Sequence, residues 1–202
     1  VVHVVANTRF AKKCELAGVD AIVAEGFEAG GHNGREETTT LCLIPMVCET
    51  VQIPVIAAGG IGSGKAMAAV FCLGAEGVQV GSRFAASLES SAHDAFKQAI
   101  VAAGDGDTKL TLKELTPVRL LRNGFSEQVE AAYARGASKE ELAALLGRGR
   151  AKKGMYEGDL QEGELEIGQV SALIHDLKSA SDIVNEMMAS FRSTCQGLVA
   201  FQ

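Results

Sequence analysis

Two stretches of the chain repeat one pattern of residues. Residues 17–26 read AGVDAIVAEG and residues 73–82 read LGAEGVQVGS, so a glycine, an acidic residue and an apolar run recur at matching positions. Each run predicts a strand that follows a helix, and repeated strand–helix units predict a parallel sheet covered by helices. The predicted fold class is α/β, as either an eight-stranded barrel or an open doubly wound sheet.

Four strand–helix units can be traced along the first part of the chain. We expect strands over 1–6, 20–25, 55–58 and 77–80, and helices over 8–17, 39–51, 63–73 and 88–103. Four units make half of an eight-stranded barrel, which needs roughly 250 residues. The chain has 202 residues and no initiator methionine, so we expect a fragment whose barrel is completed by a missing N-terminal half. The strand residues expected to face the barrel interior are Val4, Ile22, Ile56 and Val78.

The pattern changes after residue 105. Residues 115–125 are expected to be irregular, and residues 126–135 helical. Ser138 and Glu141 have the spacing of a capping box at a helix start. We therefore predict three segments: the C-terminal half of a barrel over 1–105, a helical and irregular subdomain over the barrel mouth at 106–168, and terminal helices over 169–202 that pack back on the barrel.

Composition narrows the classes of protein that fit. Hydrophobic residues make up 47% and charged residues 22%, which are values of a globular domain. The net charge is −6 and no basic stripe is present, so a nucleic-acid partner is not expected. The apolar runs are too short for a membrane span. Five scattered cysteines without a CxxC motif favour reduced thiols in the cytoplasm, and no metal site is expected.

Glycines stand where three of the predicted strands end. Gly30 and Gly31 follow the second strand, Gly59 and Gly60 follow the third, and Gly81 with Ser82 follows the fourth. The carboxyl ends of parallel strands meet at one edge, where α/β barrels bind ligands. Backbone N–H groups of glycines can approach a phosphate closely because no side chain intervenes. These three groups of glycines at the strand ends, here called the glycine corners, predict one cofactor site.

His32 is the candidate catalytic residue. It lies between glycines at the end of a predicted strand, where an imidazole can act as an acid or a base near neutral pH. Glu25 occupies the last strand position and can point into the barrel mouth. We expect Glu28 to be solvated, and Asn33 and Arg35 to lie on the loop surface.

The motifs together resemble one superfamily. Residues 24–34 (AEGFEAGGHNG), 53–64 (IPVIAAGGIGSG) and 74–84 (GAEGVQVGSRF) are similar to motifs of the flavin-dependent enoyl-acyl-carrier-protein reductases and of their relatives, the nitronate monooxygenases. Residues 157–174 (EGDLQEGELEIGQVSALI) favour the reductase branch. The resemblance runs from Val1 to about Phe191.

The resemblance implies an FMN-binding TIM barrel with a helical subdomain, and His32 matches the catalytic histidine. It implies cofactor contacts at Gly30 and Gly31 beside the flavin, at Gly59, Gly60, Ile61, Gly81 and Ser82 around the ribityl phosphate, and at Glu25 on the same strand end. The family's glycine–methionine loop and flavin-binding asparagine are absent from this chain.

The implied function is an FMN-dependent reductase that passes hydride from NADH or NADPH through flavin N5 to an enoyl thioester on acyl carrier protein, in bacterial fatty acid synthesis. The alternative is a nitronate monooxygenase that oxidises alkyl nitronates with O2. A second alternative is a non-catalytic, flavin-free fragment. The resemblance also implies dependence on a monovalent cation, and a homodimer is expected.

Overall fold

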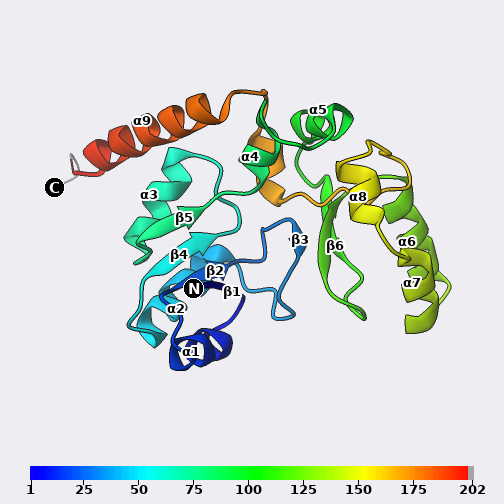
Figure 1. Cartoon of the computed structure of the whole chain (residues 1–202), viewed down its shortest axis with the longest axis horizontal. Helices are drawn as coiled ribbons and strands as arrows, with labels where there is room; N and C mark the ends of the chain where they lie inside the picture. The colour runs from blue at the N-terminus through cyan, green and yellow to red at the C-terminus, as the bar shows by residue number, and fades with distance from the viewer. Residues whose placement is uncertain (200–202) are drawn as a thin grey trace.

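The structure is a computed structural model that describes residues 1–199 and contains two β-sheets with helices around them (Figure 1). The strands are β1 (Val2–Val5), β2 (Ala21–Glu25), β3 (Gly31–His32), β4 (Val55–Ala58), β5 (Gly77–Gln79), β6 (Thr108–Thr111) and β7 (Val118–Leu121). The α-helices are α1 (Thr8–Leu16), α2 (Thr40–Thr50), α3 (Gly64–Cys72), α4 (Ser82–Ala85), α5 (Asp94–Ala102), α6 (Gly124–Ala134), α7 (Lys139–Leu146), α8 (Arg150–Met155) and α9 (Ala180–Val199). A 3₁₀ helix, η1, spans Gln169–Leu173.

The first sheet is parallel and has the strand order β1-β2-β4-β5. The strands of this sheet that follow one another along the chain are therefore also neighbours in space, and α1, α2 and α3 connect them. A doubly wound sheet would reverse its strand order at a switch point, whereas a barrel adds each strand on the same side. The α/β fold is confirmed, and the strand order is that of a barrel.

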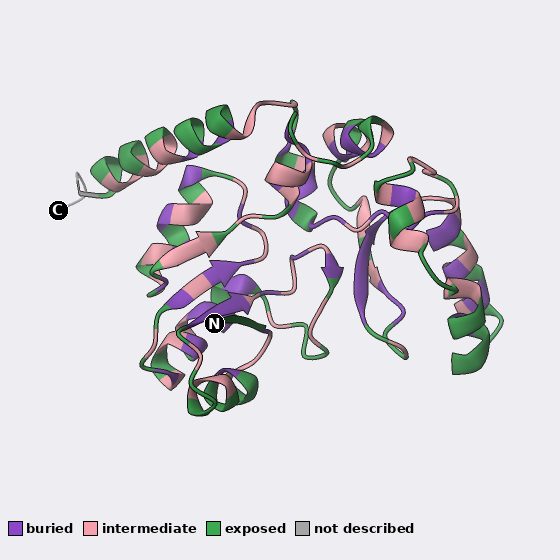
Figure 2. Ribbon diagram, in the orientation of Figure 1, coloured by how far each residue is buried: buried purple, intermediate pink, exposed green. Residues whose placement is uncertain are grey.

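One face of this sheet packs against its connecting helices. Ile22 of β2 and Ala57 of β4 join a buried core with Leu43, Ile44 and Val47 of α2. The strand β2 is buried over its first four residues (Figure 2). This apolar layer fixes the helices on the outer side of the sheet.

Of the four strand residues expected to face the barrel interior, two, Ile22 and Val78, face the helices instead. In the parallel register, Val4 lies beside Val23, and Val23 lies beside Ile56, so these side chains share the face opposite the helices. Ile22 and Val78 belong to the helix-covered core instead. Side chains alternate along a strand, and an offset of one residue exchanges the two faces.

One expected helix start differs from the structure. The first helix begins at Thr8, as expected, and the Asn7 side chain caps it by accepting the amide of Phe10. The helix expected from residue 88 begins at Asp94, where the His93 ring accepts the amide of Ala95. The capping box of Ser138 and Glu141 is present at the start of α7, as predicted.

The second sheet is antiparallel and has the order β3-β7-β6. Residues 115–125, expected to be irregular, contain the buried strand β7. The helices α6 and α7 cover this sheet through a core that includes Leu120, Phe125 and Leu142. The short strand β3 comes from the glycine-rich loop after β2, so this loop joins the two sheets.

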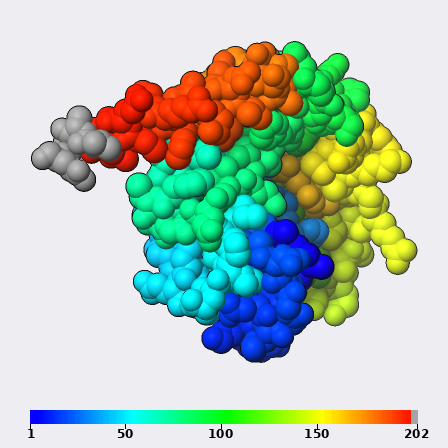
Figure 3. Space-filling model, turned by 60° about the vertical axis from the view of Figure 1, so that its left-hand side comes forward, coloured from blue at the N-terminus to red at the C-terminus, as the bar shows by residue number. Residues whose placement is uncertain are grey.

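The helix α9 packs along α3 and extends beyond the rounded body of the molecule (Figures 1 and 3). The rings of Phe71 and Phe191 lie 5.4 Å apart at this contact. The segment 169–202, expected to form terminal helices, contains η1 and α9; residues 174–179 between them are not helical, and residues 200–202 lie outside the described residues. Over residues 1–199, no helix is both long and apolar enough to cross a membrane.

The α3–α9 contact makes a testable prediction. A Cβ atom at Gly64 would overlap backbone atoms of Met187 and Phe191, so Gly64→Ala should lower the free energy of unfolding by about 1–3 kcal/mol. Gly197 of α9 has no atom within 4 Å of such a Cβ, and Gly197→Ala should leave stability unchanged or raise it by up to about 1 kcal/mol. Urea unfolding of both variants checks this; equal effects would contradict the close helix approach.

Candidate active site

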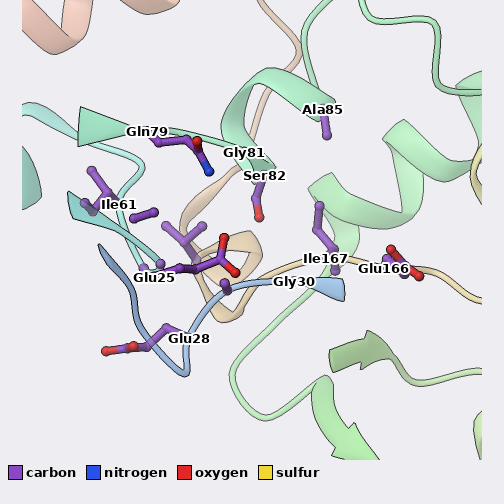
Figure 4. A pocket seen from close by; sticks show the side chains of 15 residues that line it. Glu25, Glu28, Gly30, Ile61, Gln79, Gly81, Ser82, Ala85, Glu166 and Ile167 are labelled. Atoms are coloured by element: carbon purple, nitrogen blue, oxygen red, sulfur yellow. The ribbon is translucent and has the colours of Figure 1, made fainter. Parts of the chain in front are cut away.

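The three glycine corners line one cavity of about 240 Å³, here called the glycine-lined cavity (Figure 4). The loops after β2, β4 and β5 supply it because these strands end at the same edge of the parallel sheet. The predicted residues that line it are Glu25, Gly30, Gly59, Gly60, Ile61, Gly81 and Ser82. The other lining residues are Glu28, Ala29, Ala58, Gln79, Ala85, Glu166, Ile167 and Val170.

The corner after β4 presents free backbone donors. Gly59 and Gly60 have positive φ values of 90° and 69°, which favour glycine. A Cβ atom at Gly59 would lie 2.7 Å from the Gly26 carbonyl oxygen. Among residues 1–199, the amides of Gly59, Gly60 and Ile61 donate no hydrogen bond to another protein group. Such amides suit a phosphate, so this corner fits the FMN phosphate that the resemblance implies.

The corner after β5 is open on the cavity side. A Cβ atom at Gly81 would meet no atom within 4 Å. Ser82, the first residue of α4, accepts the amide of Gly168 on its Oγ at 3.0 Å. The Ser82 side chain therefore anchors the segment around Gly168 to the cavity wall and keeps its own hydroxyl hydrogen to donate.

Two glutamates of the first corner differ in orientation. Glu25 ends β2, and its side chain extends toward Gly30 (Figure 4). Burial raises the pKa of the Glu25 carboxyl. Glu28 was expected to be solvated, but its carboxylate accepts the amide of Thr40 at 2.9 Å and the Thr40 hydroxyl at 2.9 Å. Glu28 therefore holds the loop to the start of α2.

His32 lies outside the glycine-lined cavity. Its side chain is exposed, and it lines a second cavity of about 220 Å³, here called the His32 cavity. Gly31 does not line the first cavity either, and a Cβ atom at its position would lie 2.9 Å from Oε2 of Glu166. Glu166 lines both cavities. The two spaces therefore adjoin at Glu166, with the predicted cofactor corners on one side and His32 on the other.

A buried arginine fixes the loop that carries these residues. Arg119 of β7 donates from Nε and Nη2 to the Phe27 carbonyl oxygen at 3.2 and 2.9 Å. Its guanidinium also lies 4.5 Å from the centre of the Phe27 ring. Gly31 pairs with Arg119 and His32 with Val118 in the antiparallel sheet. Burial lowers the pKa of Arg119, and these contacts compensate for part of its desolvation.

Asn33 and Arg35 were expected on the loop surface: Arg35 is exposed as expected, Asn33 is partly buried, and both make contacts that order the loop. The Asn33 side chain donates to the carbonyls of Ala29 and Gly31, each at 3.0 Å. Arg35 is exposed and donates to the carbonyl oxygens of Lys113 and Leu115 at 3.0 and 2.7 Å. The glycine-rich loop is thus held against the segment that connects β6 and β7 of the second sheet.

The segment 166–170 was missed as part of the site. The Gln169 amide donates to the Glu28 carbonyl at 2.9 Å, and a Cβ atom at Gly168 would lie 2.9 Å from the same oxygen. This glycine was the available signal, because it marks a close approach of two chain segments. Over residues 1–199, no group of three or more His, Cys, Asp or Glu side chains is arranged to hold a metal ion.

These features define an α/β barrel fold with a cavity at the carboxyl ends of its strands. A sequence profile of the nitronate monooxygenase family matches residues 1–190. The chain belongs to this family, whose members are oxidoreductases.

Three relatives illustrate the similarity. FabK from Thermotoga maritima is 40% identical and superimposes with a TM-score of 0.93 over 100% of this chain and 64% of that chain. The (3aS,4S,5R,7aS)-5-hydroxy-7a-methyl-1-oxo-octahydro-1H-indene-4-carboxyl-CoA dehydrogenase of Rhodococcus jostii (strain RHA1) is 32% identical over 94% of this chain and 64% of its own length. A probable nitronate monooxygenase of Staphylococcus saprophyticus is 34% identical over 85% of this chain and 51% of its own length. The chain thus spans less than two thirds of each relative.

The open corner at Gly81 yields a second prediction. A Cβ atom at Gly81 has open space around it, so we expect Gly81→Val to fold, to place a branched side chain at the cavity wall and to lose FMN. The matched control is Gly104→Val, in a loop outside the cavity. The FMN retained after gel filtration and the melting temperature measure the two effects separately. Full retention of FMN by Gly81→Val would contradict a phosphate role for this corner.

Stability should depend on the protonation of Glu164, which lines the His32 cavity. Burial, and secondarily Glu166, raises the pKa of Glu164 to about 7. The folded protein then holds a proton that the unfolded chain releases, so stability is fully present below pH 4.5, the group's ordinary pKa, and falls as the pH rises through 7. Relative to Glu164→Gln, the wild type should lose about 2–3 kcal/mol over this range in urea unfolding. Parallel pH profiles would contradict this prediction.

Proposed function

We propose that the protein is an FMN-dependent reductase that uses NADH or NADPH to reduce a 2-enoyl thioester carried by acyl carrier protein. The observation that carries this proposal is the similarity to FabK along the whole chain, which is combined with a cavity built from the three glycine corners. A homodimer, dependence on a monovalent cation and a place in the cytoplasm belong to the same proposal.

The residues of the glycine-lined cavity fit FMN in chemical type. The amides of Gly59, Gly60 and Ile61 would hold the phosphate, and Gly30 would allow the ring system to lie against the backbone. Bound FMN would supply the capacity to accept hydride from the nicotinamide and deliver it to the substrate. Glu25 would lie beside the cofactor, because it ends β2 and lines the same cavity.

His32 would act on the substrate. Reduction of an enoyl thioester places negative charge on the carbonyl oxygen as hydride arrives at the β-carbon, and an imidazole N–H donor stabilises that charge. The imidazole can then supply the proton for the α-carbon. Arg119 would position this residue, because it fixes the Phe27 carbonyl and pairs with Gly31 beside His32.

Nitronate monooxygenase activity is the alternative, supported by the family profile and by the curated relatives of that name. In that reaction His32 would lie against the nitro group. A flavin-free, non-catalytic fragment is the second alternative. The purified protein should be tested with NADH and crotonyl thioester, and separately with propionate-3-nitronate and O2. Thioester-dependent oxidation of NADH supports the reductase, nitronate-dependent uptake of O2 supports the monooxygenase, and absence of flavin absorbance supports the fragment.

The proposed catalytic role of His32 makes a fourth prediction. Because His32 lies outside the glycine-lined cavity, His32→Ala should retain FMN while turnover falls by about 10²–10⁴-fold, the usual effect of losing an acid–base group. His175→Ala is the control, since His175 is exposed and lines neither cavity. Steady-state kinetics and the flavin-to-protein absorbance ratio measure both properties. Loss of flavin without a separate effect on rate would contradict the catalytic role.

A further inference from the structure

The His32 cavity combines an apolar wall with carboxylates. Leu112, Val118 and Leu146 supply apolar surface, while Glu164 and Glu166 supply the acidic groups. The volume of about 220 Å³ is enough for a short chain of a ligand rather than for a single water molecule. The cavity is therefore shaped for a ligand that is apolar along most of its length and polar at one point.

Glu164 has no partner in the described chain. It is 8% exposed, and over residues 1–199 its carboxylate makes no hydrogen bond or ion pair. The cation beside it, Arg150, is engaged elsewhere: its guanidinium donates to the carbonyl oxygens of Leu145, Leu146 and Glu162 and lies 4.3 Å from the centre of the Phe125 ring. A carboxyl group in this environment lowers stability unless water in the cavity or a ligand satisfies it.

The neighbouring charges indicate which ligand chemistry fits. Glu166, from the same segment, faces the cavity as a second acid, and His32 from β3 and Arg150 from α8 are the other titratable groups around it. An anionic group would be repelled by the two glutamates because Arg150 is already engaged. A plain alkyl chain would leave Glu164 buried without a partner. An O–H or N–H donor satisfies the carboxyl oxygen in either protonation state.

We propose that the His32 cavity binds the part of the thioester that carries an O–H or N–H donor on an otherwise apolar chain, with Glu164 accepting that hydrogen bond. The proposal rests on the proposed function and names the substrate class of the same site. Two sources of the donor share this chemistry: a hydroxyl group on the acyl chain, and an amide N–H group of the pantetheine arm. An enoyl thioester without either donor is a poor substrate.

Three substrates distinguish the two sources. They are the S-ethyl thioester of but-2-enoate, which has no donor, the S-ethyl thioester of 4-hydroxybut-2-enoate, and but-2-enoyl pantetheine. We expect kcat/KM of the wild type to be about 10- to 100-fold higher for one of the two donor-bearing substrates than for the donor-free S-ethyl thioester of but-2-enoate. Glu164→Leu should abolish that ratio, while Glu164→Gln, which keeps a carbonyl acceptor, should retain most of it.

The control variant is Glu157→Leu, at an exposed position that lines neither cavity; its substrate ratio should equal that of the wild type. Thermal unfolding adds a measurement that separates ligand binding from a structural role. If Glu164 serves a ligand, Glu164→Leu should melt at a higher temperature than the wild type at pH 8, because it removes a buried carboxylate without a partner. A lower melting temperature together with an unchanged substrate ratio would overturn the proposal.

Binding measurements keep this test independent of the reaction. Calorimetry with the saturated S-ethyl thioesters of butanoate and 4-hydroxybutanoate, and with butanoyl pantetheine, requires no turnover. A donor-bearing ligand that binds about 10-fold more tightly to the wild type, but not to Glu164→Leu, supports the cavity assignment even where no thioester is reduced. Equal affinities of all three ligands for the wild type overturn it, whether or not Glu164→Leu folds. Thioester reduction with equal affinities would leave the proposed function standing and remove only this inference.

Discussion

The parallel register of the first sheet is the constraint on which the site depends. Glu25 is paired with Ala58, and Ala58 with Gln79, so β2, β4 and β5 end at the same level. The glycine corners that follow them must then meet at one edge. A displacement of one strand by one residue would turn Glu25 toward the helices and separate the corners. The buried layer between the sheet and α1–α3 holds this register.

The second sheet places His32, the proposed catalytic residue. Arg119 connects the two parts, because its guanidinium binds the Phe27 carbonyl while its backbone pairs with Gly31. The segment 166–170 closes the arrangement through Ser82 and Glu28. The proposed cofactor corners and His32 are thus placed by different sheets, with Glu166 between the two cavities. This separation explains why cofactor binding and acid–base chemistry should respond to different substitutions.

Local patterns predicted the elements whose signals lie within a short stretch of sequence. The strands after Gly18 and Gly74 and the capping box at Ser138 were found because turns and caps depend on neighbouring residues. The strand β7 was missed because its partners, β3 and β6, are distant and because Arg119 interrupts its apolar run. The faces of Ile22 and Val78 were misassigned because strands of a parallel sheet are apolar on both sides and show little alternation.

The sequence predicted the glycine corners of the candidate site but not the parts that lie beyond them. Seven of the residues expected there line one cavity, including Gly30, Gly60 and Gly81. The position of His32 in a neighbouring cavity could not be derived, because it depends on pairing with Val118. Glu164 and Glu166 gave no local signal either, since the cavity that they line is built largely by segments that precede them by many residues.

The most direct test of the account is a crystal structure of the purified protein with FMN and a saturated thioester. We predict the phosphate within hydrogen-bonding distance of the amides of Gly60 and Ile61 and beside Gly81, with the thioester in the His32 cavity. Flavin bound elsewhere, or a thioester remote from His32, would contradict the assignment of the two cavities.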